Sequence, residues 1–180
     1  VEGFLAPLLQ NNANWSGTRT VVLGCGGSAR AVVAGLQDLN PSDITIVGRR
    51  AETLHPFCND LQQGRPANSV LLQPLLDTDP HLQTRIQQAD LVVNTPPVGM
   101  SSHQPDRGPA LPLGLDIWDK LTAQTVLYDL IYTPRPTPWL KRGERLGCRT
   151  YDGLEMLVQQ GAAALRHWSG IDEVPVDAMR

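Results

Sequence analysis

The stretch that decides the fold lies near the start of the chain and reads Thr20-Val21-Val22-Leu23-Gly24-Cys25-Gly26-Gly27-Ser28-Ala29. A β-branched run leads directly into glycines and then into helical apolar spacing, which predicts a strand, a tight loop and a helix. The loop fits G-x-G-x-x-A. Gly24 permits the turn off the strand, Gly26 lets the backbone approach a pyrophosphate, and Ala29 allows close packing of helix on strand.

This loop predicts a site for the pyrophosphate of a dinucleotide, because the free N–H groups and the positive dipole end of the helix face it. The residues expected to hold the phosphates are Gly24, Cys25, Gly26, Gly27, Ser28 and Ala29. We expect Cys25 to fill space, with its side chain pointing inward. A tight turn without a ligand is the alternative interpretation of the same glycines.

Strands and helices alternate outward from this stretch. The apolar runs predict strands at 20–24, 44–47, 69–72, 90–94, 125–129 and 148–150, and helices at 28–39, 51–61, 81–88, 137–146 and 153–168. Such alternation implies right-handed crossovers. We therefore predict an α/β, Rossmann-type, doubly wound fold, with a mostly parallel six-stranded sheet and helices on both faces.

The expected organisation is a single domain with short extensions. Residues 1–17 form a lead-in segment with a short helix, 18–170 the dinucleotide-binding domain including the helix at 153–168, and 171–180 a tail. The long segment 96–118 carries no predicted element, and loops of that length are usually functional or mobile.

The end of the second strand indicates which cofactor is bound. NAD-binding domains of this type usually carry an acid there, which accepts the ribose 2′-OH. Here the strand runs into Gly48-Arg49-Arg50, and the first acid is Glu52. Because a guanidinium can bind a 2′-phosphate with two hydrogen bonds, the pair predicts NADP. A solvated basic turn is the alternative. A methyltransferase is disfavoured, because that class normally carries an acid at this position.

Composition excludes several other classes of function. The net charge is −3, without the basic excess of a nucleic-acid-binding protein. No apolar run could span a bilayer and no signal peptide is visible, so neither a membrane nor secretion is predicted. The three cysteines and four histidines lack metal-ligand spacing, so no metal site is predicted. A reducing cytoplasm is the simplest location.

Four ordered motifs resemble one family. The segments 90–100, 129–134 with 137–140, and 152–161, together with Gly3-Phe4, are similar to motifs of the shikimate dehydrogenases. The resemblance covers the chain from Val1 to about Gly170. It implies an oxidoreductase of aromatic amino acid biosynthesis that uses NADPH to reduce 3-dehydroshikimate to shikimate.

The resemblance also implies roles for particular residues. Gly24 to Ser28 would hold the pyrophosphate, and Gly48, Arg49, Arg50 and Thr53 the 2′-phosphate end of the adenosine. Asn94, Thr95 and Pro96 would lie beside the nicotinamide ribose. The nicotinamide would be lined by Leu130 and Gly153, and shikimate would be contacted by Tyr132 and Gln160.

The family's catalytic Lys and Asp belong to an N-terminal substrate domain that lies upstream of the matching motifs. Because this chain starts at Val1 without Met, we expect a fragment that lacks that domain, contains no catalytic residue and is inactive alone. A homodimer stays open as a partner. Two alternatives also stay open: a stand-alone NADP-binding regulatory or sensor module, and the quinate/shikimate dehydrogenase branch.

Overall fold

A single sheet forms the centre of the molecule. The computed structural model describes residues 1–10, 13–63, 69–100 and 111–180. Within them six strands pair in the order β3-β2-β1-β4-β5-β6, and each pairing is parallel. The predicted doubly wound α/β fold is confirmed, and the described sheet is parallel throughout rather than mostly parallel. The strands are β1 Arg19–Leu23, β2 Asp43–Gly48, β3 Leu71–Leu76, β4 Leu91–Asn94, β5 Val126–Asp129 and β6 Arg149–Tyr151.

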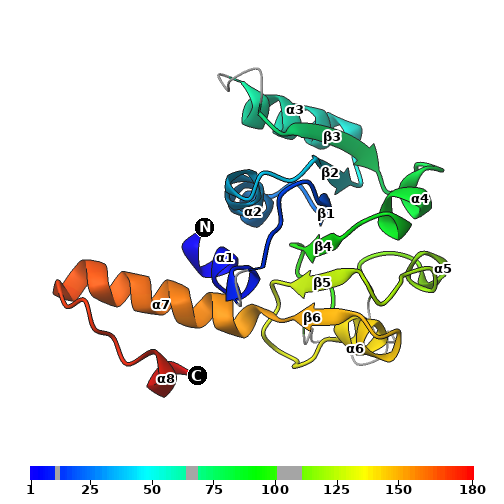
Figure 1. Ribbon diagram of the computed structural model, residues 1–180. Helices are drawn as coiled ribbons and strands as arrows, with labels where there is room; N and C mark the ends of the chain where they lie inside the picture. The colour runs from blue at the N-terminus through cyan, green and yellow to red at the C-terminus, as the bar shows by residue number, and fades with distance from the viewer. Residues whose placement is uncertain (11–12, 64–68, 101–110) are drawn as a thin grey trace.

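Helices cover both faces of the sheet (Figure 1). One face carries α1, α2 and α3, and the other carries α4, α5 and α6, as the ribbon shows. The long helix α7 follows β6 and packs against α1. The helices are α1 Glu2–Leu8, α2 Gly27–Asp38, α3 Ala51–Gln62, α4 Leu82–Gln87, α5 Leu115–Trp118, α6 Pro138–Arg145, α7 Gly153–Ser169 and α8 Val176–Met179.

The core is divided by the sheet into two apolar clusters. Side chains alternate along each strand, so neighbours in sequence enter opposite clusters. Val22 and Val93 pack under α1, α2 and α3, whereas Val21 and Val92 pack on the opposite side. Both faces of every central strand are therefore buried, which explains why these strands are continuously apolar. On the second face the rings of Trp118 and Trp139 lie 5.2 Å apart.

The structure corrects three details of the sequence-based prediction. The third strand lies at Leu71–Leu76 rather than 69–72, and it contains Pro74. A proline cannot donate to a ladder, and it is tolerated because β3 is at the edge of the sheet. The segment 96–118 includes the short helix α5, and the tail contains α8. Both helices are four residues long, too short for apolar periodicity to reveal.

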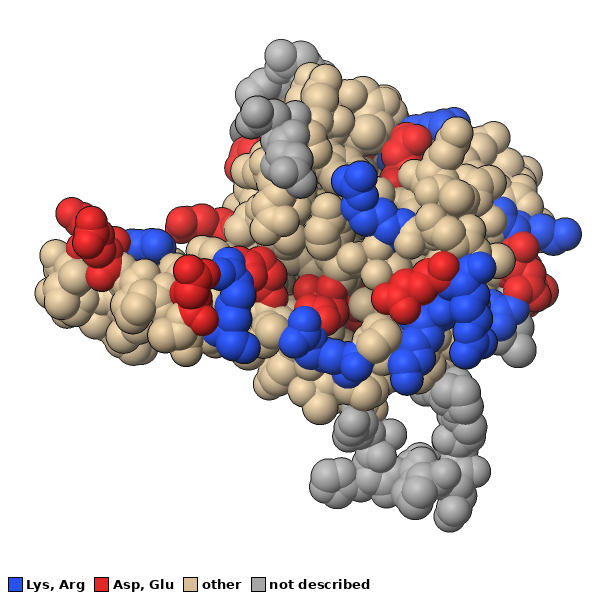
Figure 2. All heavy atoms as spheres, turned by 60° about the horizontal axis from the view of Figure 1, so that its bottom comes forward, with Lys and Arg blue, Asp and Glu red and all other residues tan. Residues whose placement is uncertain are grey.

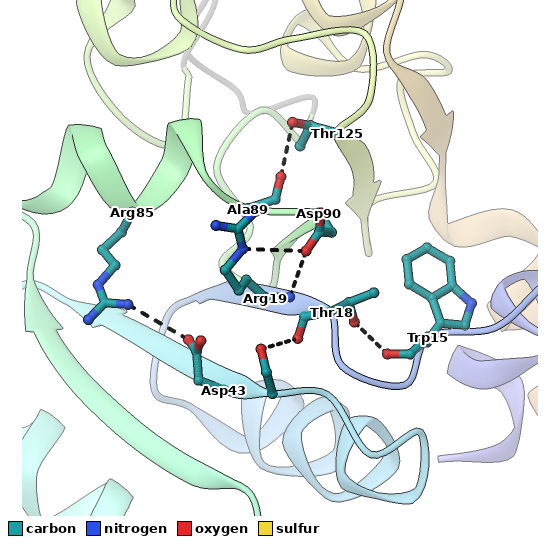
Figure 3. Close-up of polar contacts among 9 residues, drawn as sticks. Trp15, Thr18, Arg19, Asp43, Arg85, Ala89, Asp90 and Thr125 are labelled. Atoms are coloured by element: carbon teal, nitrogen blue, oxygen red, sulfur yellow. Dashed lines mark hydrogen bonds and ion pairs between the residues drawn. The ribbon is translucent and has the colours of Figure 1, made fainter.

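The amino ends of the strands are joined by polar contacts (Figure 3). The carboxylate of Asp90 accepts a hydrogen bond of 2.7 Å from the backbone N–H of Arg19, linking the beginnings of β1 and β4. The hydroxyl of Thr125 donates to the carbonyl of Ala89 at 3.0 Å, and Arg85 lies 4.0 Å from Asp43. These charged and polar groups connect the amino ends of the strands, at the edge opposite the one where ligands bind in such folds.

Helix α7 extends beyond the sheet (Figure 1) and carries the C-terminal segment back along its side. The guanidinium of Arg180 donates two hydrogen bonds of 2.8 Å to the carboxylate of Glu155. These bonds, with one from Gln159, lower the pKa of Glu155 to about 2. Farther along α7 several apolar side chains are exposed, among them Leu157 at 41% and Trp168 at 80%.

Charge on the surface is mixed. Acidic and basic side chains lie next to one another on the face drawn in Figure 2. None of the described helices is long and apolar enough to cross a membrane. Within the described ranges, no three His, Cys, Asp or Glu side chains come together as metal ligands would, and His103 lies outside those ranges.

Candidate cofactor cleft

A cleft of about 770 Å³ opens at the carboxyl ends of β1, β2 and β4. The strand order reverses here, because β1 is flanked by β2 on one side and β4 on the other. Ligands of open parallel sheets bind at such a switch point. The residues that line the cleft are Leu23, Gly24, Cys25, Gly26, Gly27, Ser28, Val47, Gly48, Arg49, Arg50, Thr53, Asp77, Thr95, Pro96, Pro97, Val98, Leu111, Pro112 and Leu113.

Gly24 makes the turn from β1 into the loop. Its φ is +97°, a conformation that residues with a side chain rarely adopt. Its backbone N–H donates to the carbonyl of Val47 at 2.8 Å, which ties the loop to β2. A Cβ at this position would lie 2.7 Å from the hydroxyl of Thr95, and that hydroxyl donates to the carbonyl of Leu23 at 2.6 Å. Both conformation and space therefore require glycine here.

Gly26 and Gly27 are different, because nothing in the protein requires them to lack a side chain. A Cβ at either position would meet no atom within 4 Å. Gly26 is the N-cap of α2 and no side chain caps the helix, so the N–H groups of its first turn are available to a ligand. Ala29 lies beneath the loop and is fully buried, as its predicted packing role requires. The loop has the open backbone and the helix dipole that an anionic pyrophosphate needs.

The basic pair at the end of β2 also lines the cleft. Arg49 and Arg50 are exposed, and the guanidinium of Arg50 lies 3.9 Å from the carboxylate of Glu52. Ion pairs between such exposed groups are weak, so the guanidinium of Arg50 can turn to another anion. The hydroxyl of Thr53 donates to the carbonyl of Arg50 at 3.0 Å and lies 3.8 Å from the sulfur of Cys25. Cys25 is half-buried and packs against the core, as expected.

The predicted ribose position Asn94 does not line the cleft, because it is fully buried at the end of β4. Its amide donates a hydrogen bond of 2.9 Å to the carboxylate of Asp129 at the end of β5. Asp129 also accepts from the hydroxyl of Thr137 at 2.8 Å and from the backbone N–H of Ile131 at 3.2 Å. Burial raises the pKa of Asp129, although these hydrogen bonds act in the opposite direction. Asn94 therefore supports the loop after β5, while Thr95 and Pro96 face the cleft.

The remaining predicted residues lie outside the cleft, toward β5 and α7. A Cβ on Gly153 would lie 2.0 Å from the carbonyl oxygen of Leu130, so these two positions are in direct contact. Tyr132 is 43% exposed. Gln160 is exposed on α7 beside α1, since a Cβ on Gly3 would lie 2.9 Å from its Cγ.

Several residues of the cleft escaped the sequence-based prediction. Asp77 follows β3, and it was missed because the end of that strand was placed too early. Its position could have been found from the rule that the carboxyl ends of parallel strands share one edge. The apolar residues that line the cleft after β4 gave no signal in the sequence, because the segment 96–118 has no apolar periodicity. The other missed residues are Leu23, Val47, Pro97, Val98, Leu111, Pro112 and Leu113.

The fold and the cleft together define the class of this protein, a Rossmann-type domain of the dinucleotide-binding kind. The features that define this class here are the glycine loop at the switch point and the basic pair at the end of the second strand.

The comparisons with known proteins identify the family. Residues 153–180 match the family model described as the shikimate 5′-dehydrogenase C-terminal domain. The shikimate dehydrogenase (NADP(+)) of Synechocystis sp. is 46% identical over 180 residues, which is 100% of this chain and 59% of that protein. The chain belongs to the shikimate dehydrogenase family, and it spans about 60% of the length of the curated relatives that it matches.

Solved structures agree in fold. A shikimate 5-dehydrogenase from Listeria monocytogenes, in complex with shikimate and NAD, has a TM-score of 0.83 at 24% identity, covering 99% of this chain and 60% of that one. A shikimate dehydrogenase in complex with NADP+ has a TM-score of 0.78 at 26% identity, covering 99% and 57%. The alternative of a stand-alone sensor module is not favoured by these relatives.

Proposed function

We propose that this chain binds NADP as the cofactor domain of a shikimate dehydrogenase. The observation that carries the proposal is the uncapped glycine loop facing the same cleft as Arg49 and Arg50. The loop suits a pyrophosphate, and the two guanidinium groups suit a 2′-phosphate. A cytoplasmic location fits the three free cysteines.

The order of the strands suggests how the cofactor lies. From the loop after β1, the adenosine half would extend over the end of β2, toward Gly48 and Thr53. The nicotinamide half would extend over β4 and β5, past Thr95 and Pro96. Under this proposal Leu130 and Gly153 hold the nicotinamide ring, and the next side chains outward, Tyr132 and Gln160, contact the substrate.

When bound, NADPH supplies the hydride that reduces 3-dehydroshikimate. The reaction also needs a proton for the developing alkoxide, and a positioned acid–base group contributes roughly 10²–10⁴ in rate. Among the described residues that line the cleft, Asp77 and the two arginines are the ionisable ones besides Cys25. An arginine stays protonated, and Asp77 lies at the adenosine end. We propose that the acid–base groups come from outside these 180 residues, from a substrate domain or a second copy.

Discrimination between NADPH and NADH tests the cofactor proposal. We expect the chain to bind NADPH about tenfold to a hundredfold more tightly, because one charge-assisted hydrogen bond contributes about 1.5–3 kcal/mol. Arg49→Ala should weaken the binding of NADPH and leave that of NADH nearly unchanged. Calorimetric titration of both cofactors measures this, with Arg30→Ala as a control on the exposed surface of α2. Equal affinities in the wild-type chain would contradict the proposal.

The activity of the isolated chain tests where the acid–base groups lie. We expect the chain to bind NADPH without oxidising it when 3-dehydroshikimate is added, because the ketone is neither held in place nor protonated. The absorbance of the reduced nicotinamide should therefore stay constant. The sample must be free of intact host enzyme. Turnover that is lost on Tyr132→Phe would show that this chain carries the whole active site.

A further inference from the structure

Asp77 is the one carboxylate among the described residues that line the cleft. Asp77 follows β3 directly and lines the cleft together with Gly48 and the basic pair. Its backbone N–H donates to the carbonyl of Gly48 at 3.0 Å, which holds it beside the end of β2. Among the residues that the structure describes, none donates a hydrogen bond to its carboxylate and none forms an ion pair with it. The carboxylate is half-buried and lines the cleft, so it is available to accept a hydrogen bond from a ligand that enters the cleft.

The strand order places Asp77 along the proposed cofactor. The pyrophosphate would lie over the loop after β1, and the ribose 2′-phosphate over the end of β2 at Arg49 and Arg50. The next strand outward is β3, at the edge of the sheet. Adjacent strands are about 4.8 Å apart, so one further strand corresponds to the step from a ribose to its base. Asp77 therefore lies where the adenine would be.

The chemistry of the adenosine half leaves few groups for a carboxylate to accept from. The phosphates are anions and repel it, and an ionised carboxylate is an acceptor only. Beyond the ribose, the exocyclic amine of adenine is the group with N–H donors to offer. We propose that Asp77 recognises the adenine base by accepting a hydrogen bond from this amine. This inference rests on the proposed binding of NADP.

Recognition of this kind predicts selectivity for the base. A hypoxanthine base carries a carbonyl in place of the amine, and its oxygen would face the carboxylate with no proton between them. A site that is built to accept a hydrogen bond discriminates strongly against a ligand that lacks the donor, because the polar groups are left unpaired.

The test compares NADPH with its hypoxanthine analogue, deamino-NADPH, in calorimetric titrations of the full chain. We expect the wild-type chain to prefer NADPH by at least about tenfold. Asp77→Asn should bring the two affinities to within about threefold, because an amide can either accept from adenine or donate to hypoxanthine. The loss of the negative charge of Asp77 should strengthen phosphate binding equally for both cofactors. This common effect cancels in the ratio of the two affinities.

Asp79→Asn is the matched control, with the same change of charge two residues away. The carboxylate of Asp79 accepts from the backbone N–H of His81 at 2.8 Å and does not line the cleft, so the preference for NADPH should persist. Equal affinities in the wild-type chain, or an unchanged preference in Asp77→Asn, would overturn the inference and leave the proposed function intact. If the wild-type chain binds neither NADPH nor the analogue, the proposed function fails, and the inference fails with it.

Discussion

Gly26→Val should reduce the affinity for NADPH by more than about a hundredfold while the chain stays folded. The pyrophosphate needs several backbone N–H groups of the loop, each charge-assisted bond contributing about 1.5–3 kcal/mol, and a valine side chain would occupy the space between them. The protein itself has room for the substitution, since a Cβ at Gly26 would meet no atom within 4 Å. Its backbone is extended, with φ −99° and ψ −167°, which suits any residue. Fluorescence titration with NADPH measures the loss of affinity. The free energy of unfolding, followed by thermal unfolding, should change by no more than about 1 kcal/mol.

Gly24→Ala provides the contrast, because the two glycines differ in what surrounds them. At Gly24 a Cβ would lie 2.7 Å from the hydroxyl of Thr95 and 2.9 Å from the ring of Pro96, at a φ of +97°. This variant should lose stability by about 1–3 kcal/mol. Wild-type affinity in Gly26→Val would show that the loop does not approach the pyrophosphate.

Asp129→Ala should destabilise the chain by about 3–5 kcal/mol, the largest effect on folding that we expect, because buried donors lose their acceptor and a cavity forms. Asp129 is fully buried. It accepts hydrogen bonds from Asn94, Ile131 and Thr137. Its removal therefore leaves three donors without an acceptor, near the ends of β4 and β5 and the start of α6. An unpaired buried donor costs about 1–3 kcal/mol, and a small cavity adds to this. Urea unfolding followed by tryptophan fluorescence measures the difference, since the chain has four tryptophans.

Thr20→Val is the matched control for a buried polar group. The hydroxyl of Thr20 is buried and has no hydrogen-bond partner among the described residues, so its replacement by a methyl group should be neutral or stabilising. If Asp129→Ala is as mild as Thr20→Val, the network around Asp129 does not stabilise the fold.

The pH dependence of stability gives a second measure of the same group. Because burial raises the pKa of Asp129, the folded chain holds this proton more tightly than the unfolded chain. The contribution of this carboxyl to stability is therefore greatest at low pH and falls as the pH rises through the folded pKa. Asp129→Ala should lack this part of the pH dependence.

The amino-acid sequence by itself determined the fold class, the phosphate loop and the basic pair. Each of these is encoded locally. The run from Thr20 to Ala29 contains its own strand, turn glycines and helix start, and Arg49 and Arg50 follow Gly48 with no intervening residue. Apolar periodicity placed five of the strands within a few residues of their observed positions. The motifs also pointed to the family that the comparisons identified.

Only the tertiary structure decided which distant strand ends meet in the cleft. Asp77 lies beside Gly48 because β3 pairs with β2, and Leu130 touches Gly153 because the chain returns from β6 into α7 over the end of β5. The same holds for the buried contact between Asn94 and Asp129. Strand order and pairing register arise from packing two apolar faces at once, which is a property of the assembled sheet. Local spacing contains no record of strand order or register, so the contacts of Asp77 with β2 and of Asn94 with Asp129 were visible only in the folded chain.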